Sequence, residues 1–284
     1  WSAFLESKKF RIKTIKLRGQ ISQGLIVSIR EVLGDIEKSI LLEEGMDITE
    51  VIGITKYELP APKHHEAAGN FPLFLSKTDE IRIQSKPGLL EEMKELPFVA
   101  TVKCDGQSGT FYKYQGHFGV CSRNFELKPP TEDKQPSNWW LVAKKYNLEQ
   151  VIPEGYAVQG EIVGPGIQGN RLGLKEVDLY IFDVLSNGAE GKFSYLDYSD
   201  AKDLVEEWRL KFVPEEMWIG CDESHKYLHS IKYWLQKANG IYIGTNNQRE
   251  GLVVRPLKTT RSEILEGRLS WKIISQEFLL KGGD

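Results

Sequence analysis

The sequence predicts an α+β fold built mainly on antiparallel sheet. From residue 98 onward, short β-rich segments alternate with glycine-containing turns, and stretches of amphipathic helical spacing lie between them. The chain has 284 residues, of which 40% are hydrophobic, so it can bury a sizeable core. This length and composition exclude a disordered tail and a small disulfide scaffold.

Each expected element follows from its local pattern. Strands are expected where apolar and β-branched residues cluster between breakers, at 98–103, 110–114, 118–122, 156–163, 179–184, 251–255 and 269–274. Helices are expected where apolar residues recur every three or four positions, at 140–151, 201–210 and 225–238. A run of breakers that includes Pro60, Pro62, Gly69 and Pro72 has little to bury and predicts a linker at residues 61–75.

Charge and cysteine content bear on the class of ligand and on the cellular compartment. The net charge is −3, so a nucleic-acid ligand would have to meet a local basic patch. Cys104, Cys121 and Cys221 form no CxxC pair, which favours a reducing, intracellular compartment, cytoplasmic or nuclear. No apolar run approaches the roughly 18 residues of a membrane span, and we expect no membrane partner.

A basic segment near the start of the chain has two interpretations. Six basic residues and no acidic one lie between Lys8 and Arg18, interleaved with apolar residues at strand spacing. Lys9, Arg11 and Lys13 would share one face. They either protect a solvated strand edge from aggregation or line a groove that follows a nucleic-acid backbone.

The most informative short motif is Lys103-Cys104-Asp105-Gly106, at the end of an apolar strand. The lysine projects from a rigid strand end, the aspartate two residues on has the same parity, and the glycine lets the backbone turn closely around a ligand. A lysine nucleophile with an ordinary pKa near ~10.4 needs that pKa lowered or a metal nearby. Taken alone, such a turn is more often a hairpin corner.

The motifs that follow Lys103 raise its significance. In order, these are Ser122-Arg123-Asn124, Gly160-Glu161, Phe182-Asp183, Glu250-Gly251 and Trp271-Lys272. This ordered set resembles the covalent nucleotidyltransferases, which comprise ATP-dependent DNA ligases, RNA ligases and GTP-dependent mRNA capping enzymes. Those enzymes attach a nucleoside monophosphate to a motif lysine, and Lys103 matches that lysine.

The resemblance implies a nucleotide site. Lys103 would be the nucleophile, Lys272 would contact the α-phosphate and Arg82 the departing pyrophosphate. Phe182 would stack on adenine, and Arg123 would contact the ribose or the nucleic acid. The duller alternatives are a core aromatic at Phe182 and a solvated strand-end charge at Arg123.

The resemblance also implies a divalent metal, Mg²⁺ or Mn²⁺. Asp105, Glu161 and Glu250 are the carboxylates that the family pattern places near it, directly or through water. A rival zinc site would use Cys221, His225 and His229, but three ligands spread over two helical turns fit one zinc ion poorly.

The two ends of the chain narrow the resemblance to one branch of the superfamily. Twelve residues follow Lys272, too few for the C-terminal OB domain of DNA ligases and capping enzymes. The basic segment and residues 77–84 resemble RNA ligases that carry an N-terminal OB domain. We therefore expect an OB-like nucleic-acid-binding domain at 1–60, lacking its first strands, and an adenylation domain at 76–284. Many relatives have a basic residue where this chain has Ser270.

The functional prediction is a monomeric ATP-dependent RNA ligase. It would join RNA 3′-hydroxyl and 5′-phosphate ends, including those of a nicked duplex, through AMP bound covalently to Lys103. A DNA ligase or a capping guanylyltransferase is the first alternative. The second is a non-catalytic nucleic-acid-binding protein that retains the fold, although an intact Lys103 and Asp105 argue against it.

Overall fold

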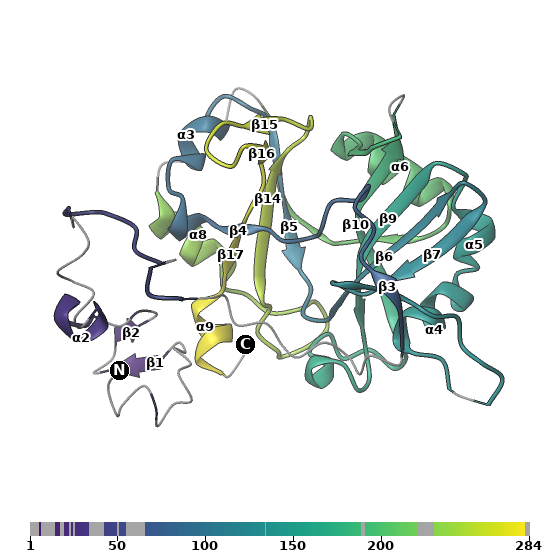
Figure 1. The fold of residues 1–284 in the computed structure, drawn as a ribbon, viewed down its shortest axis with the longest axis horizontal. Helices are drawn as coiled ribbons and strands as arrows, with labels where there is room; N and C mark the ends of the chain where they lie inside the picture. Colours follow the sequence, from purple (N-terminus) through teal and green to yellow (C-terminus); the bar gives the residue numbers. More distant parts are fainter. Residues whose placement is uncertain are drawn as a thin grey trace. The chain divides into compact units, whose positions relative to one another are not determined.

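The structure is a computed structural model, drawn in Figure 1. The residues it describes are 6, 15–17, 20–22, 24, 26–33, 43–49, 51–54, 66–133, 135–188, 191–220 and 230–281. The chain divides into two compact units, Trp1–Pro62 and Lys63–Asp284. Within the described ranges, no helix is long and apolar enough to cross a membrane.

The described residues of the first unit include a small hairpin and a short helix. Strand β1 (Ile15–Leu17) pairs with β2 (Gln20–Ser22) in antiparallel register, and α2 spans Ile29–Leu33. β1 falls inside the basic segment expected to be strand. The three residues assigned there to RNA binding, Lys9, Arg11 and Lys13, lie outside the described residues. The OB-like barrel therefore stays a prediction.

The second unit contains a five-stranded sheet that carries the motif lysine. Its strand order is β13-β5-β14-β17-β4, and every pairing is antiparallel except that of β17 with β4. The strands are β4 (Ile81–Arg82), β5 (Phe98–Lys103), β13 (Glu215–Ile219), β14 (Gly251–Pro256) and β17 (Trp271–Ile274).

A second, eight-stranded sheet faces the first (Figure 1). Its path is β11-β10-β9-β6-β7-β8-β3, and β12 pairs in parallel with β10. The strands are β3 (Ala67–Asn70), β6 (Gln107–Tyr114), β7 (His117–Cys121), β8 (Phe125–Leu127), β9 (Tyr156–Val163), β10 (Asp178–Asn187), β11 (Phe193–Tyr195) and β12 (Lys211–Phe212).

Helices cover the outer face of each sheet. On the five-stranded sheet these are α3 (Leu89–Met93) and α8 (Ile231–Ala238), and on the eight-stranded sheet α4 (Asn138–Lys145), α5 (Leu148–Val151) and α6 (Tyr198–Glu207). The remaining elements are η3 (Ile83–Ser85), η4 (Gln168–Asn170), the β15–β16 hairpin (Arg261–Ser262 and Gly267–Arg268) and α9 (Gln276–Leu280).

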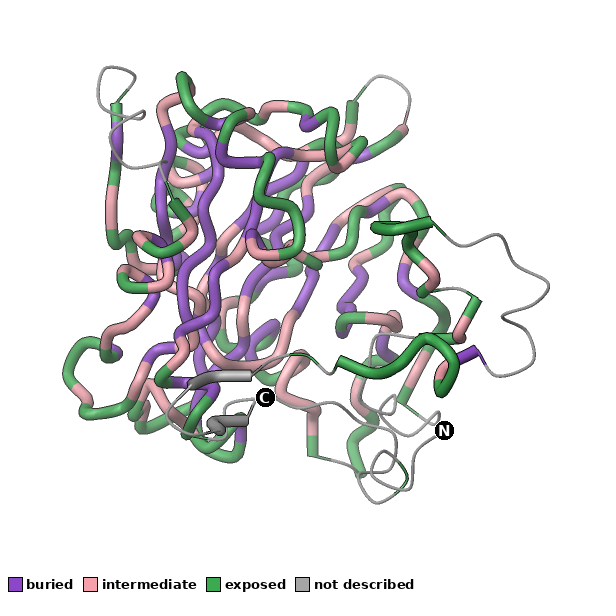
Figure 2. The backbone as a smooth tube through the Cα atoms, turned by 90° about the vertical axis from the view of Figure 1, so that its left-hand side faces the viewer, coloured by how far each residue is buried: buried purple, intermediate pink, exposed green. Residues whose placement is uncertain are grey.

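Alternate residues of each strand point to opposite faces of the sheet, so core residues lie on one face and site residues on the other. In β5, Phe98 and Ala100 point outward into an apolar cluster with Trp234 of α8 and Trp271 of β17. The residues of opposite parity, which include Lys103, therefore point toward the second sheet. Burying one face of each sheet under helices stabilises the unit and leaves the two inner faces to carry polar side chains. Figure 2 shows the buried strands running through the interior.

Three of the differences from the expected elements have a clear physical reason. The expected helix 140–151 is two helices, because Asn147 adopts a left-handed φ of 51° between α4 and α5. The helix expected from 225 begins at Ile231, where the Ser230 side chain caps the Tyr233 amide; Cys221, His225 and His229 lie outside the described residues. Within the expected linker, residues 67–70 form β3, because small residues can still pair through their backbone with β8.

Candidate active site

The motif lysine and a glutamate from the neighbouring strand form an ion pair. Lys103 ends β5, and its Nζ donates to Oε2 of Glu250 at 2.7 Å. Both side chains are partly buried, 23% and 16% exposed. Gly251, which pairs in register with Lys103, has a φ of 153°, and a Cβ there would lie 2.0 Å from the Ile273 carbonyl oxygen. Only glycine allows this close strand contact beside the lysine.

The turn after Lys103 brings two further carboxylates to the same place. Gly106 packs against β9 so closely that a Cβ would lie 2.3 Å from the Ile162 carbonyl oxygen. Its backbone amide donates to Glu161, and Asp105 one residue earlier forms an ion pair with Arg171 Nε at 3.0 Å. The two carboxylates therefore arrive from different elements, the turn after β5 and strand β9.

These charges shift one another's pKa values. Burial raises the pKa of Glu161 to about 8, and the Glu250 and Asp105 carboxylates add to the effect against the opposing pull of Lys103. Burial also raises the pKa of Asp105 to about 6, with Glu250 adding to it and Arg171 opposing it. Burial alone would lower the pKa of Lys103, but Glu250, Glu161 and Asp105 outweigh it and hold that pKa above its ordinary value.

This arrangement keeps Lys103 protonated, which is the opposite of what a nucleophile requires. Glu250 raises the pKa of both Asp105 and Glu161, as expected of carboxylates gathered where a divalent cation can bind. Among the described residues, no group of three Asp, Glu, His or Cys side chains is close enough to hold one ion directly. Mg²⁺ usually keeps several of its waters and is bound by only one or two carboxylates, so such an ion needs no direct three-carboxylate site.

Two predicted phosphate contacts are neighbours in the five-stranded sheet. Lys272 of β17 pairs in register with Arg82 of the parallel strand β4, and on its other side with Val253 of β14. Val253 in turn pairs with Thr101, two residues before Lys103. Lys272 and Arg82 thus lie on the lysine's face of the sheet, one row away, although they are 190 residues apart in the chain.

Phe182 and Asp183 have different surroundings. Phe182 lies at a bulge in β10, is partly buried, and packs against a small cluster that contains Cys104 and Val163. Asp183 is buried and accepts from Arg255 at 2.7 Å and from Arg268 at 2.8 Å. Arg255 is therefore a buried bridge between the sheets and not a solvated strand-end charge.

Arg123 lies in the turn between β7 and β8. Its guanidinium pairs with Asp79 at 2.6 Å, and both side chains are 43% exposed. Cys121 just before this turn pairs with Thr110. Ser108, two residues before Thr110, pairs with Glu161. The turn therefore lies at the Glu161 end of the eight-stranded sheet, and the arginine itself points to the segment that leads into β4.

Comparison with known proteins now identifies the family. The RNA ligase family matches residues 96–274, which contain Lys103, Asp105, Glu161, Glu250 and Lys272. The chain belongs to the RNA ligase family. No curated protein sequence matches it.

Solved structures of an RNA ligase from Naegleria gruberi are similar to this family member over nearly its whole length. The structure with PPi is 33% identical to this chain, and the match covers 95% of this chain and 75% of the Naegleria chain, with a TM-score of 0.76. A variant with ATP and Mn is 34% identical, with coverages of 96% and 77% and a TM-score of 0.78. A variant with AMP and Mn is 33% identical, with coverages of 95% and 76% and a TM-score of 0.75.

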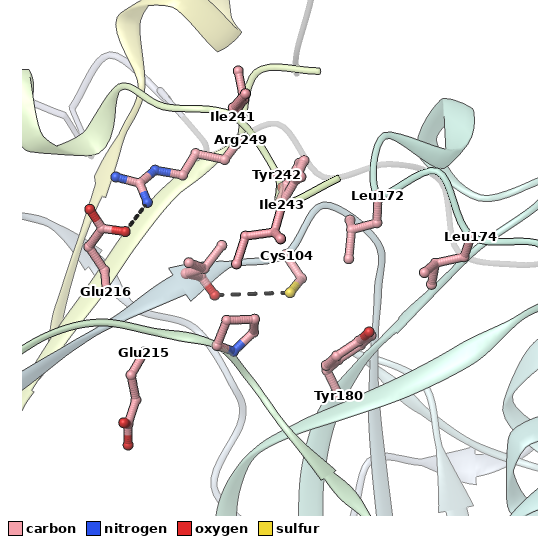
Figure 3. A pocket seen from close by; sticks show the side chains of 12 residues that line it. Cys104, Leu172, Leu174, Tyr180, Glu215, Glu216, Ile241, Tyr242, Ile243 and Arg249 are labelled. Atoms are coloured by element: carbon pink, nitrogen blue, oxygen red, sulfur yellow. Dashed lines mark hydrogen bonds and ion pairs between the residues drawn. The ribbon is translucent and has the colours of Figure 1, made fainter. Parts of the chain in front are cut away.

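This RNA ligase family member also has a cavity of about 160 Å³, lined by the chain neighbours of the motif lysine but not by Lys103 itself (Figure 3). Residues from several elements line it: Val102, Cys104, Leu172, Leu174, Tyr180, Pro214, Glu215, Glu216, Ile241, Tyr242, Ile243 and Arg249. Phe182 is not one of them, and the aromatic side chains in its wall are Tyr180 and Tyr242.

Sequence reasoning missed two residues that contact the site. Arg171 comes from a glycine-rich loop after β9, and its guanidinium also lies over the Phe278 ring at 4.6 Å. Tyr242 comes from the loop between α8 and β14, where its hydroxyl meets the backbone of Lys103 and Glu250. Neither residue belongs to a periodic pattern. The only available signal for Arg171 was a run of glycines that permits close packing of a loop.

Proposed function

We propose that the protein is an ATP-dependent RNA ligase in which Lys103 carries the covalent AMP. One observation carries the proposal: Lys103 meets Glu250, Glu161 and Asp105 on the inner face of a sheet, with Lys272 and Arg82 in the next row. Family membership and the ATP, AMP and PPi bound to the Naegleria enzyme support the same chemistry.

In the first step, the neutral Lys103 amine attacks the α-phosphorus of ATP. A P–N bond forms as the bond from the α-phosphorus to the bridging oxygen breaks, and pyrophosphate leaves. The proton that the attacking nitrogen loses passes to Glu250, which accepts its hydrogen bond. Glu250 orients Nζ through their hydrogen bond, and Lys272 and Arg82 offer positive charge to the phosphates. Asp105, Glu161 and Glu250 would hold a divalent cation, which would supply positive charge that offsets the carboxylates and favours the neutral amine.

In the later steps, AMP passes from Lys103 to an RNA 5′-phosphate, and a neighbouring 3′-hydroxyl displaces it. Phe182 stacks on adenine and Arg123 contacts the ribose or the RNA in this proposal. We further propose that the protein acts as a monomer on ends brought together in a nicked duplex.

Labelling with nucleotide tests the proposal. The protein is incubated with α-labelled ATP or GTP and Mg²⁺ or Mn²⁺, and covalent label is measured. ATP alone should label it. Lys103→Ala and Lys103→Arg should abolish the label, since arginine keeps the charge but offers no neutral amine. Lys94→Ala, at the exposed residue that follows α3, should label normally. Label from GTP, or label retained without Lys103, would contradict the proposal.

The basic N-terminal segment carries the proposed RNA contact. Its positive charges have no evident role in activating ATP but suit a phosphate backbone. Replacing Lys9, Arg11 and Lys13 with glutamine should preserve self-adenylylation while weakening sealing. The log–log salt slope of RNA binding should fall by about 2, at roughly 0.7 per single-strand phosphate contact. An unchanged slope with normal sealing would assign these residues to strand-edge protection.

A further inference from the structure

Tyr242 links the backbones of the two residues that form the central ion pair. Its side chain is 5% exposed, and its hydroxyl donates to the Lys103 carbonyl oxygen at 2.9 Å. The same hydroxyl accepts from the Glu250 amide at 3.1 Å. Because burial raises the pKa of Tyr242 above its ordinary value, the hydroxyl keeps its proton and remains a donor.

The position of this hydroxyl explains why it matters. Register pairing between β5 and β14 extends to Lys103 and Gly251. Beyond that pair, the hydroxyl joins the Lys103 carbonyl to the amide of Glu250. The link therefore fixes the two backbones at the point where the Lys103 and Glu250 side chains meet, 2.7 Å apart.

Tyr242 is itself held in place by its own loop. Its amide donates to the Asn247 carbonyl oxygen at 3.0 Å, and its carbonyl accepts from the Thr245 hydroxyl at 2.9 Å. The Asn247 side chain donates to the Arg171 carbonyl oxygen at 2.8 Å, and Arg171 pairs with Asp105. The loop thus connects the supports of three site residues, and Figure 3 shows Tyr242 lining the cavity together with Cys104.

We propose that Tyr242 is a positioning residue for the adenylylation of Lys103: its hydroxyl fixes the backbones of Lys103 and Glu250 so that the amine is aligned for attack. The proposal rests on the proposed function, because it assumes that Lys103 accepts AMP. It concerns alignment, not nucleotide binding. Loss of the hydroxyl should therefore slow the chemical step and leave the affinity for ATP unchanged.

Tyr242→Phe tests this, since it removes the hydroxyl and keeps the ring in the cavity wall. The rate of Lys103 labelling at saturating ATP and Mn²⁺ should fall roughly tenfold or more, with KM for ATP unchanged within about twofold. Sealing of pre-adenylylated RNA should fall much less, because that step does not use the lysine amine as a nucleophile. Tyr146→Phe is the matched control. It removes a tyrosyl hydroxyl that donates to Asp178, away from Lys103, and should label at the wild-type rate.

The outcomes distinguish a failure of the positioning role of Tyr242 from a failure of the proposed function. If wild-type protein takes no label from ATP, the proposed function fails first. If wild-type protein labels and Tyr242→Phe labels at the same rate, the positioning role is wrong. Equal losses in labelling and in sealing of pre-adenylylated RNA, a raised KM for ATP, or the absence of a cooperative thermal transition would make Tyr242 a structural or binding residue and would also overturn the proposal.

Discussion

Two groups of charged side chains lie between the sheets of the second unit, and they differ in balance. Around Lys103, three carboxylates surround one amine, and the pKa values of Glu161 and Asp105 are raised. Around Asp183, two arginines share one carboxylate oxygen, and the three side chains are 15% exposed or less. In the first group three carboxylates meet two cations, Lys103 and Arg171, so ionising Glu161 leaves a negative charge that a metal cation can offset. The carboxylate of the second group is closely paired within the protein.

The difference teaches which charges are available for chemistry. A carboxylate already bonded to two guanidinium groups has little capacity for a further cation, and its loss leaves buried positive charge behind. A crowded set of carboxylates gains stability when a cation arrives. We therefore interpret the Lys103 group as the reactive site and the Asp183 group as a fastening between the sheets.

After loss of Lys103 itself, the largest effect on activity is expected from Glu250→Gln. This change keeps the shape of the side chain but removes its charge beside Lys103, so self-adenylylation should slow by about 100-fold or more. Because one of three mutually repelling carboxylates is lost, the melting temperature of the metal-free protein should not fall. The measurements are the single-turnover labelling rate and a thermal melt. Glu91→Gln on the exposed face of α3 is the control and should change neither. A normal labelling rate would remove Glu250 from the site.

The largest effect on stability is expected from Asp183→Ala. Breaking a buried ion pair by removing one partner costs about 3–5 kcal/mol. At roughly 2–4 °C per kcal/mol for a unit of this size, the melting temperature should fall on the order of 10 °C. Asp79→Ala is the matched control, because its ion pair with Arg123 is half-exposed and should contribute about 1 kcal/mol or less. Equal melting temperatures for the two variants would show that the Asp183 group does not fasten the sheets.

A smaller effect is expected in the pH dependence of stability. Burial raises the pKa of Glu161 from 4.5 to about 8 in the folded, metal-free protein. Between pH 5 and 8 the unfolded chain has lost this proton while the folded protein keeps it, so the free energy of unfolding falls as pH rises. Glu161→Gln should remove this fall in the free energy of unfolding.

Thermal melts of both proteins in chelator measure the pH effect. The melting temperature of Glu161→Gln minus that of the wild type should grow from pH 5 to pH 8 and then level off. Added Mg²⁺ should stabilise the wild type increasingly over the same range, because the cation competes with the proton. Parallel pH profiles for the two proteins would mean that the Glu161 pKa is not raised.

Most of the second unit could be predicted from local patterns. The strands at 98–103 and 156–163 match β5 and β9, because alternating buried residues and flanking turns define both ends. The α+β class and the ATP-dependent RNA ligase family are confirmed. The break at Asn147 was missed, since one residue with positive φ leaves helical spacing intact on both sides.

The sequence predicts which residues form the candidate site better than it predicts their pKa values. The motif order placed Lys103, Glu161, Glu250 and Lys272 in one site, and the register of the sheets shows how four segments meet there. The sequence required a lowered lysine pKa or a metal. Which of these applies depends on the charges that the fold places around the lysine. Glu250, Glu161 and Asp105 raise the Lys103 pKa, so a metal is the expected activator.

The sequence by itself determined the fold class and the family and predicted the reactive lysine, because strand periodicity and ordered motifs are local properties of the chain. Only the tertiary structure decided which charged residues are closely paired and which remain available. Asp183 and Glu161 both lie in apolar strands beside an aromatic or a glycine, but Asp183 meets two arginines across the sheets and Glu161 meets two other carboxylates. The tertiary structure also placed the Tyr242 hydroxyl against Lys103, since a loop contact between distant residues leaves no periodic trace in the sequence.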